Sequence, residues 1–416
     1  MHLGVIADDF TGATDVAGFL TTAGVETVQL VGVPSDDVEP EARAVVVSLK
    51  SRSCPPGEAV GDSLAALAWL RARGCRQVYQ KYCSTFDSTP QGNIGPVADA
   101  LLEALGAELT VICPALPVNG RTVYGGYLFV DEVLLEQSGM RHHPANPMTE
   151  SHLGRLMEAQ SSGRAGVVGF DYVEEGAAAV TRRLEDLRSQ AVRYGVVDAL
   201  LPRHLDVLAE AVDGMPLVTG GSGLAAAMAR TWSDRMSPEA AAAKGRPSGG
   251  PGVVLSGSCS EMTRAQVTRY VSAAPARAID LERTLDDPSY AHELAEWVRQ
   301  RQADRLAPLV YATIDPAGLR AAHERFGAGT GRAIEQVFAS LAGLLAEAGT
   351  RQFIVAGGET AGAVVQALGV GGFNVGPQIA PGVPWVRAIG KPYSMALKSG
   401  NFGREDFFFA CQEEKA

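Results

Sequence analysis

Short runs of apolar, often β-branched residues alternate along this chain with stretches rich in Ala and Leu. Apolar strands separated by helices are typical of parallel sheets that carry helices on both faces. The pattern therefore predicts an α/β protein. In the first half we expect strands at residues 1–7, 27–31, 44–49, 77–81, 109–113, 165–168, 192–197 and 216–218, and helices at 16–23, 59–73 and 202–212.

The segment 237–252 breaks this alternation, because it loses large apolar residues and gains Gly, Pro and Ser. Such a change is typical of a domain boundary. A chain of 416 residues is long enough for two or three domains. We therefore expect two α/β domains with mainly parallel sheets: an N-terminal domain at 1–236, a linker at 237–252, and a C-terminal domain at 253–416 with strands at 253–255, 309–312 and 353–356.

Charge and composition exclude several classes of protein. The formal net charge of −11 argues against a nucleic-acid groove as the main feature of the surface. The six cysteines form no CxxC pair and no zinc-like spacing, so we expect free thiols in a reducing compartment. The start MHLGVIADDF lacks a signal-peptide pattern, and no run approaches the roughly 18 apolar residues of a membrane span. These features predict a cytoplasmic protein without a nucleic-acid or membrane partner.

Acidic residues gather where the first strand should end and the first helix should begin. Ligands of open α/β sheets bind at such strand ends, beside the free N–H groups of helix N-termini. Helix capping accounts for one carboxylate, whereas this segment contains Asp8, Asp9 and Asp15. Carboxylates bind sugar hydroxyls, and one of them can act as a base on an attacking hydroxyl. We take Asp9 and Asp8 as catalytic candidates, with Asp9 preferred, and Thr11 as a substrate-binding candidate; capping alone is the competing interpretation.

Cationic residues follow other predicted strands. Because the carboxyl ends of parallel strands meet at one edge of a sheet, Arg52, Lys81 and Arg121 together predict a clamp for an acid. Each of them alone would fit a solvated surface charge better, and only the coincidence of all three at strand ends favours a site. The polar loops beside them add the substrate-binding candidates Asp87, Ser88, Thr89, Asn119 and Gly120.

Segments of small residues follow two strands in the second half, before helices that we expect from about residues 261 and 363. Small residues at a strand-to-helix turn let backbone amides approach phosphate oxygens, although tight packing would explain either segment alone. With the segment 398–403 they predict a nucleotide site. Its candidates are Ser256, Gly257, Ser258, Gly357, Gly358, Glu359, Thr360, Gly400, Asn401 and Gly403.

Several familiar motifs are absent from the sequence. It contains no GxxxxGK[ST] loop, no GxGxxG at the first strand and no HRD or DFG set. The glycine-rich segment 219–223 lacks dinucleotide spacing, so we interpret it as a tight turn. His142 and His143 have no carboxylate or cysteine at metal spacing, so we predict no protein-held metal. An aldolase or epimerase would need a metal cluster or a Schiff-base lysine, for which Lys81 is the one tempting candidate.

Taken together, these motifs resemble the four-carbon acid sugar kinase family over essentially the whole chain. The resemblance rests on residues 7–13, 51–52, 81, 87–89, 92–93, 114–115, 120–121, 256–258, 357–360 and 398–403. Within the family the chain is most similar to the 3-oxo-tetronate kinases, through residues 79–89 and 143–149. The family more often has Leu-Arg where this chain has Pro90 and Gln91, which indicates a changed substrate preference.

The resemblance implies that the N-terminal domain binds a sugar acid, that the C-terminal domain binds ATP with its Mg²⁺, and that the terminal 4-hydroxyl is phosphorylated. We expect the active site in the cleft between the domains and a homodimer as the candidate assembly. Two alternatives stay open. One is a kinase for threonate, erythronate or another small acid; the other is a non-catalytic nucleotide- or metabolite-binding module, which would not need both Asp8 and Asp9.

Overall fold

The computed structural model describes residues 1–143, 146–315, 318, 321, 324–327 and 329–413. It divides into two compact units, Met1–Ala241 and Ala242–Ala416. The predicted linker 237–252 contains helix α9 (Pro238–Ala241), the short 3₁₀ helix η4 (Ala243–Gly245) and the first residue of strand β12 (Gly252–Ser256). In the motif at 143–149, Pro144 and Ala145 lie outside the described residues.

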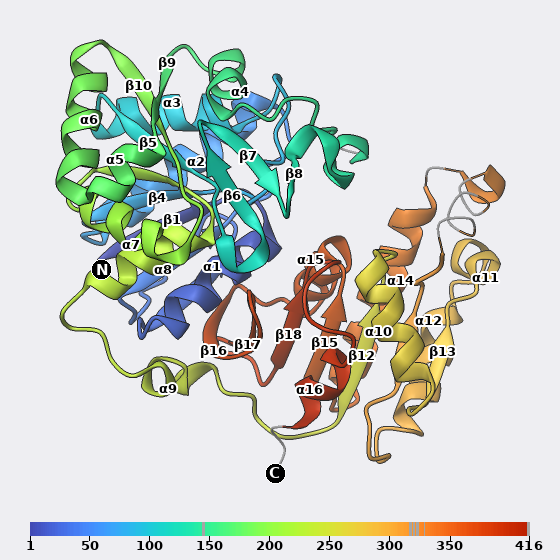
Figure 1. Cartoon of the computed structure of the whole chain (residues 1–416). Helices are drawn as coiled ribbons and strands as arrows, with labels where there is room; N and C mark the ends of the chain where they lie inside the picture. Colours follow the sequence, from blue (N-terminus) through green and yellow to red (C-terminus); the bar gives the residue numbers. More distant parts are fainter. Residues whose placement is uncertain (144–145, 316–317, 319–320, 322–323, 328, 414–416) are drawn as a thin grey trace. The chain divides into compact units, whose positions relative to one another are not determined.

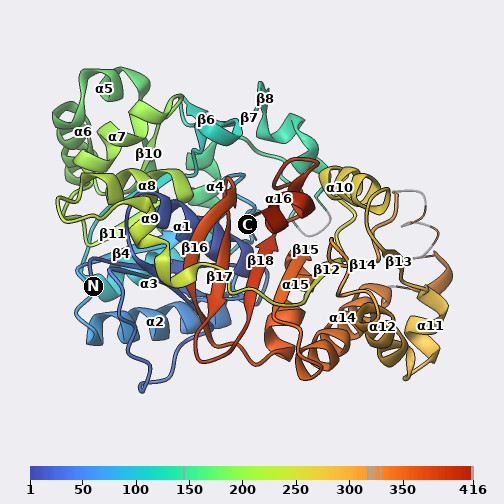
Figure 2. The ribbon, with the colours of Figure 1, turned by 90° about the horizontal axis from the view of Figure 1, so that it is seen from below.

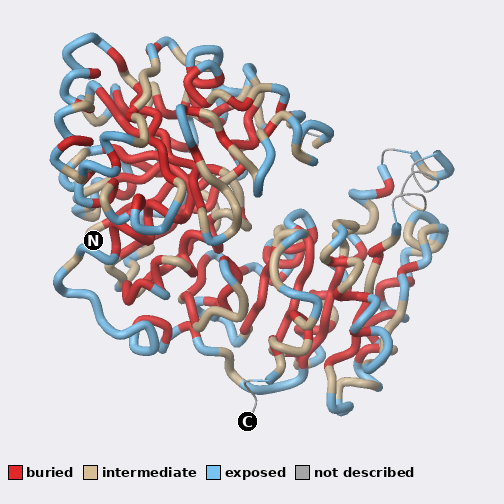
Figure 3. The backbone as a smooth tube through the Cα atoms, viewed as in Figure 1, coloured by how far each residue is buried: buried red, intermediate tan, exposed pale blue. Residues whose placement is uncertain are grey.

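The first unit is built on a parallel sheet. Its strands lie in the order β2 (Thr27–Val31), β3 (Ala44–Ser48), β1 (Leu3–Ala7), β4 (Gln77–Lys81), β11 (Leu217–Gly220), β5 (Thr110–Cys113), β10 (Val192–Val197) and β9 (Arg164–Val168). Apart from the edge strand β9, in which only Val168 is buried, the strands are almost fully buried, because helices cover both faces of the sheet (Figure 3).

Helices on the two faces of this sheet are visible in Figure 2. One face carries α2 (Pro56–Ala72), α3 (Ile94–Leu105) and α4 (Leu153–Gln160); the other carries α1 (Phe10–Thr22), α8 (Ser222–Thr231), α7 (Pro202–Ala211), α6 (Ala177–Ser189) and α5 (Phe170–Glu175). A separate antiparallel sheet, which the sequence did not predict, consists of β6 (Arg121–Tyr124), β7 (Tyr127–Val130) and β8 (Val133–Leu134).

The second unit has a mixed sheet. Its strands lie in the order β13 (Ala276–Ala278), β14 (Leu309–Tyr311), β12, β15 (Gln352–Ala356), β18 (Ser394–Lys398), β17 (Val383–Ala388) and β16 (Gly372–Ala380). The pairs from β13 to β18 are parallel, whereas β18, β17 and β16 pair antiparallel.

Helices again cover both faces of this second sheet (Figures 1 and 2). One face carries α10 (Glu261–Val271) and α16 (Phe407–Glu413); the other carries α14 (Thr330–Glu347), α15 (Gly358–Ala367), α12 (Tyr290–Arg299) and α11 (Leu281–Asp286). Aromatic side chains pack between the sheet and helices α10 and α16, where Trp385, Tyr270 and Phe408 belong to one buried cluster. Among the described helices, none is both long and apolar enough to cross a membrane.

Several predicted boundaries are wrong: helix α2 begins at Pro56 instead of residue 59, and three other errors lie at turns of small or polar residues. Helix α1 begins at Phe10 instead of residue 16, because the side chain of Asp9 caps its N-terminus. Helix α15 begins at Gly358 instead of residue 363, so the glycine-rich turn forms its first turn. Strand β11 continues to Gly220, beyond the predicted end at residue 218.

Candidate functional site

The ends of three neighbouring strands in the first unit bring the predicted acidic and basic residues together. In the sheet register, Ala7 at the end of β1 pairs with Ser48 of β3 and Lys81 of β4. The backbone of Asp8 continues this connection, since its N–H donates to the carbonyl of Lys81 at 3.1 Å and its carbonyl accepts from the N–H of Arg52 at 3.1 Å. The parallel sheet itself therefore places these residues side by side.

Arg52 is the centre of this group, because its guanidinium binds three carboxylates. Nε and Nη2 donate to the two oxygens of Asp8, each at 2.9 Å. Nη2 also donates to Asp9 at 2.8 Å, and Nη1 donates to Asp87 at 3.3 Å. The side chains of Arg52 and Asp87 are 20% and 8% exposed, so water screens these ion pairs only weakly.

This geometry gives Arg52 a different role from the one that the sequence suggested. A substrate carboxylate would need the two parallel donors of the guanidinium fork. The fork formed by Nε and Nη2 is already occupied by Asp8. We therefore interpret Arg52 as a clamp that holds the acidic residues in place, rather than as the group that holds the acid.

Asp9 is a helix cap as well as a partner of Arg52. Its carboxylate accepts hydrogen bonds from the N–H of Gly12 at 2.9 Å and from the hydroxyl of Thr11 at 2.8 Å. Burial would raise the pKa of Asp9, but the charges of Arg52 and Lys81 outweigh burial and lower the pKa below its usual value. Asp9 is thus a stable anion, which makes it a weak base.

Asp8 fits the role of a base better than Asp9, the candidate preferred from the sequence. Burial raises the pKa of Asp8 above its usual value, although Arg52 opposes the shift. Its side-chain oxygens accept two hydrogen bonds, both from Arg52, whereas those of Asp9 accept three. Because a carboxylate has about four lone-pair sites, Asp8 has more capacity left for a substrate hydroxyl.

Lys81 lies behind the acidic residues and is 2% exposed. Its ammonium donates to the carbonyl of Tyr82 at 2.9 Å and lies 4.0 Å from Asp15. Asp15 in turn accepts a hydrogen bond from Ser222, which begins helix α8. The segment 219–223 therefore packs inside the first unit, where the hydroxyl of Tyr79 also donates to the carbonyl of Gly221 at 2.6 Å.

The loop after β4 presents Asp87 through an unusual backbone conformation. Phe86 has a positive φ of 55° although it is not glycine, and its ring is fully buried against Tyr82. Such conformations cost free energy and are enriched at functional sites. Asn93 supports the neighbouring loop, since its amide donates to the carbonyls of Ser51 at 2.7 Å and Cys54 at 2.8 Å. Asp87 and the Arg52 loop are thereby held at one place.

The other substrate-binding candidates are more dispersed. Ser88 lines the same pocket as Asp8 and Lys81 and donates to Gln160 at 3.1 Å. Thr89 accepts from the N–H of Gln91 on an exposed turn. Arg121 does not line this pocket: it begins β6 on the separate sheet, and its guanidinium donates to the carbonyl of Asn119. Gly120 directly precedes this strand, and the three predicted cations do not line one pocket.

In the second unit, three neighbouring strands end in the predicted nucleotide segments. Strands β12, β15 and β18 lie next to each other, and the N-termini of α10 and α15 follow the first two of them. Gly357, with a φ of 123°, donates its N–H to the carbonyl of Lys398 at 3.0 Å. The segments 256–260, 357–360 and 398–400 therefore form one group.

The close approach of these three segments requires glycine at two positions. A Cβ atom on Gly257 would lie 2.1 Å from the hydroxyl oxygen of Thr360, and one on Gly400 would lie 2.9 Å from the hydroxyl oxygen of Ser258. Two helix N-termini beside glycine-rich turns offer free backbone N–H groups to phosphate oxygens. The donor set of this region thus fits the phosphates of a nucleotide.

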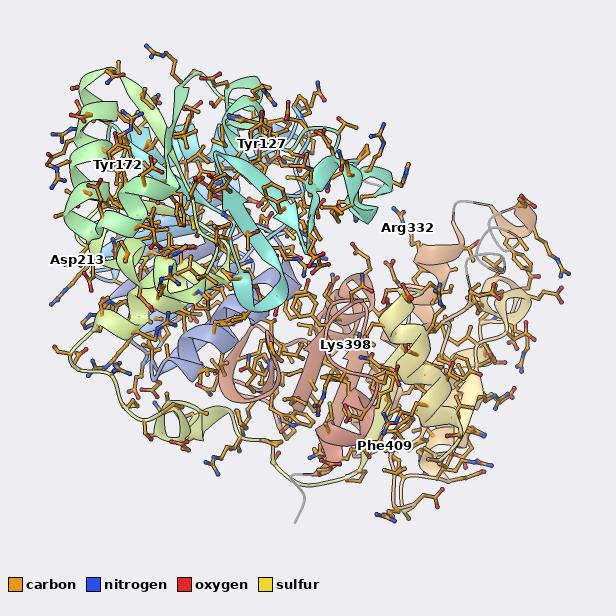
Figure 4. All side chains as sticks on the ribbon, viewed as in Figure 1. Tyr127, Tyr172, Asp213, Arg332, Lys398 and Phe409 are labelled. Atoms are coloured by element: carbon orange, nitrogen blue, oxygen red, sulfur yellow. The ribbon has the colours of Figure 1, made fainter. Side chains whose placement is uncertain are left out.

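Lys398 begins the segment 398–403 that the sequence predicted for the nucleotide site, although it was not one of the individual candidates. It is fully buried, and its ammonium donates to the hydroxyl of Thr263 at 2.9 Å and to the carbonyls of Ser399 and Gly400 at 3.1 and 2.7 Å. Burial lowers the pKa of Lys398 to about 7. Figure 4 labels Lys398 beside β18. A lysine at the end of a strand that precedes a glycine-rich loop is a sequence signal that could have identified it.

The remaining nucleotide candidates lie at the edges of the group. Glu359 is exposed in the first turn of α15. Asn401 is exposed, and Gly403 has a positive φ of 77° in the turn before α16. Gln266 of α10 holds this turn by donating to the carbonyls of Phe402 and Arg404. Within the described ranges, no group of three or more His, Cys, Asp or Glu side chains is arranged to hold a metal ion.

Comparison with known proteins matches two parts of the chain to two family models. Residues 3–228 match the family model of the sugar-binding N-terminal domain, and residues 253–408 match that of the nucleotide-binding C-terminal domain. The chain is 59% identical to the 3-oxo-tetronate kinase of Brucella melitensis over 99% of this chain and 95% of that protein. It is 54% identical to the 3-oxo-tetronate kinase of Salmonella typhimurium over 100% and 99%, and 55% identical to that of Escherichia coli over 92% and 99%.

Solved structures agree with this relationship. A Salmonella typhimurium LT2 protein, described with the provisional name tRNA synthase, superposes with a TM-score of 0.93 at 55% identity and 99% coverage of both chains. Protein HI1011 of Haemophilus influenzae superposes with a TM-score of 0.82 at 50% identity and 99% coverage of both chains. The chain therefore belongs to the four-carbon acid sugar kinase family, in the group of the 3-oxo-tetronate kinases.

Proposed function

We propose that this protein is an ATP-dependent kinase that phosphorylates the terminal 4-hydroxyl of a 3-oxo-tetronate. The observation that carries the proposal is the match of the whole chain, at 54–59% identity, to proteins named 3-oxo-tetronate kinase. The carboxylates around Arg52 and the glycine-rich group around Lys398 supply the two kinds of site that such a reaction needs.

In the first unit, Asp8 accepts a hydrogen bond from the attacking hydroxyl and takes its proton as the oxygen bonds to the γ-phosphorus of ATP. The bond from the γ-phosphorus to the oxygen that bridges it to the β-phosphorus breaks, and ADP leaves with that oxygen. Arg52 keeps Asp8, Asp9 and Asp87 in position, and Lys81 supplies a buried positive charge close by. Positioning and charge neutralisation carry most of the work in phosphoryl transfer.

In the second unit, the backbone of Gly257, Ser258 and Gly357–Thr360 contacts the nucleotide phosphates, and Lys398 fixes the Gly400 turn beside them. Mg²⁺ arrives with ATP, because it prefers phosphate oxygens and water and needs few protein ligands. A cytoplasmic location and a homodimeric assembly are further predictions, which fractionation and sedimentation can test.

The direct test is release of ADP from ATP and Mg²⁺ with 3-oxo-tetronate, followed by identification of the 4-phosphate by ³¹P NMR. Threonate and erythronate serve as competing acceptors in the same assay. We expect the highest kcat/KM for a 3-oxo-tetronate and no turnover after chelation of Mg²⁺. A higher kcat/KM for threonate or erythronate would favour the alternative kinase, and ATP binding without turnover of any acid would favour a non-catalytic module.

A further inference from the structure

The pocket beside Arg52 extends inward to Gln80 of strand β4, a residue that was not among the site candidates. The pocket is lined by the polar or charged residues Asp8, Ser51, Arg52, Ser63, Gln80, Lys81, Tyr82, Asp87, Ser88 and Asn93 and by the apolar residues Ile6, Ile94 and Val97. Gln80 is 5% exposed. Its Nε2 donates to the carbonyl of Ile94 at 3.1 Å, which fixes the amide so that Oε1 is directed away from that carbonyl.

Two acceptor atoms in this pocket are buried and have no hydrogen-bond partner among the residues that the structure describes. They are Oε1 of Gln80 and Oδ1 of Asp87. The other oxygen of Asp87 accepts from Arg52, and Oδ1 lies 3.8 Å from Nδ1 of His143. Leaving a buried acceptor unpaired costs about 1–3 kcal/mol. The pocket therefore favours an occupant that brings O–H donors.

The charges around the pocket disfavour an anionic group as that occupant. Asp8 and Asp87 line the pocket, Asp9 shares Arg52 with them, and Asp15 lies 4.0 Å from Lys81, so four carboxylates stand against the two cations Arg52 and Lys81. The cavity has a volume of about 20 Å³ for water-sized groups, which is room for one or two of them. A hydroxyl of a sugar acid fits this volume and charge, whereas its carboxylate does not.

We propose that Gln80 is a specificity residue whose Oε1 accepts a hydrogen bond from one hydroxyl of the sugar acid, with Asp87 as the second acceptor of the same subsite. This inference rests on the proposed function, because it assumes that a hydroxylated acid binds the first unit. It adds that this acid is recognised inside the pocket through a hydroxyl group, and that its carboxylate stays outside.

The test is the binding of stable acids in the absence of ATP, measured by calorimetry. The ligands are a tetronate with all three hydroxyls and the three dihydroxybutanoates that each lack one of them. The variant is Gln80→Met, which keeps the length of the side chain and removes the acceptor. The control is Gln77→Met on the same strand, since Gln77 donates to the carbonyls of Val212 and Met215 and does not line the pocket.

We expect Gln80→Met to raise the Kd of the tetronate and of two of the deoxy acids by about 3- to 10-fold, from the usual value of one hydrogen bond. The third deoxy acid should bind wild type and variant equally, which identifies the hydroxyl that contacts Gln80. Gln77→Met should leave all four Kd values unchanged. An equal loss for all four ligands, which a bound water would produce, or no loss at all would overturn the inference.

The design separates this inference from the proposed function. If Gln80→Met changes the Kd values in the expected pattern but the wild type forms no ADP with a 3-oxo-tetronate, the subsite stands and the proposed reaction fails. If wild type phosphorylates the acid while Gln80→Met changes every ligand equally, the reaction stands and the subsite fails.

Discussion

Replacing Arg52 with Ala tests whether this residue is a clamp or a ligand for the acid. The change removes four hydrogen bonds to three carboxylates and leaves Asp8, Asp9 and Asp87 facing one another. Their side chains are 17%, 25% and 8% exposed, so water compensates only part of the loss. Breaking a buried ion pair costs about 3–5 kcal/mol, which is the loss of unfolding free energy that we expect for the first unit.

The pH dependence has a definite sign. In the wild type, Arg52 and Lys81 hold the pKa of Asp9 below its usual value against the opposing effect of burial. A depressed pKa stabilises the fold above the unfolded value and loses this effect as the pH falls. Without Arg52, burial and mutual repulsion raise the carboxylate pKa values, so the variant loses stability as the pH rises. The difference in unfolding free energy between the wild type and Arg52→Ala should therefore be larger at about pH 7.5 than at about pH 5.

The assay is urea unfolding followed by circular dichroism at both pH values, with hydrogen exchange to assign the change to the first unit. Arg155→Ala is the control, because Arg155 pairs with Glu150 at 2.7 Å on the surface of the same unit and is 55% exposed. Exposed pairs contribute roughly 0–1 kcal/mol. If Arg52→Ala unfolds like the wild type at both pH values and changes only KM for the acid, Arg52 is a ligand and the clamp is wrong.

Four further substitutions test the other roles. Asp8→Asn should lower kcat by about 10²- to 10⁴-fold. Asp9→Asn should lower kcat less, because Asn still caps helix α1. A larger loss of kcat for Asp9→Asn in single-turnover assays would restore Asp9 as the base. Gly257→Ala should raise the calorimetric Kd for ATP at least about tenfold, since its Cβ would meet the Thr360 hydroxyl. The same variant should bind the acid as the wild type does. Unchanged ATP affinity would place the nucleotide elsewhere. Burial lowers the pKa of Lys398 from 10.5 to about 7, so the unfolded state binds more protons than the folded state between these pH values. The free energy of unfolding should therefore rise with pH in this range. Lys398→Met should remove this pH dependence, and an unaltered pH dependence would exclude Lys398 as its source.

The strand pattern was readable because buried strands of a parallel sheet must be apolar on both faces. The runs at 27–31, 77–81 and 192–197 coincide with β2, β4 and β10. The short strands β6 to β8 were missed, since two to four partly exposed residues leave little periodicity. The starts of α1 and α15 were displaced, because Asp9 and Gly357 are read locally as loop residues until a cap or a neighbouring strand fixes them.

Local sequence by itself determined which chemical groups stand at the strand ends: carboxylates and Arg in the first half, small residues in the second. Only the tertiary structure decided which of them face each other. In the structure, Nε and Nη2 of Arg52 both donate to Asp8, and Arg121 lies on another sheet. The buried acceptor oxygens Oε1 of Gln80 and Oδ1 of Asp87 lie in one pocket without a hydrogen-bond partner among the described residues. The physical reason is that hydrogen-bond partners depend on sheet register and strand order, which join residues far apart in the chain and leave no trace in the residues on either side.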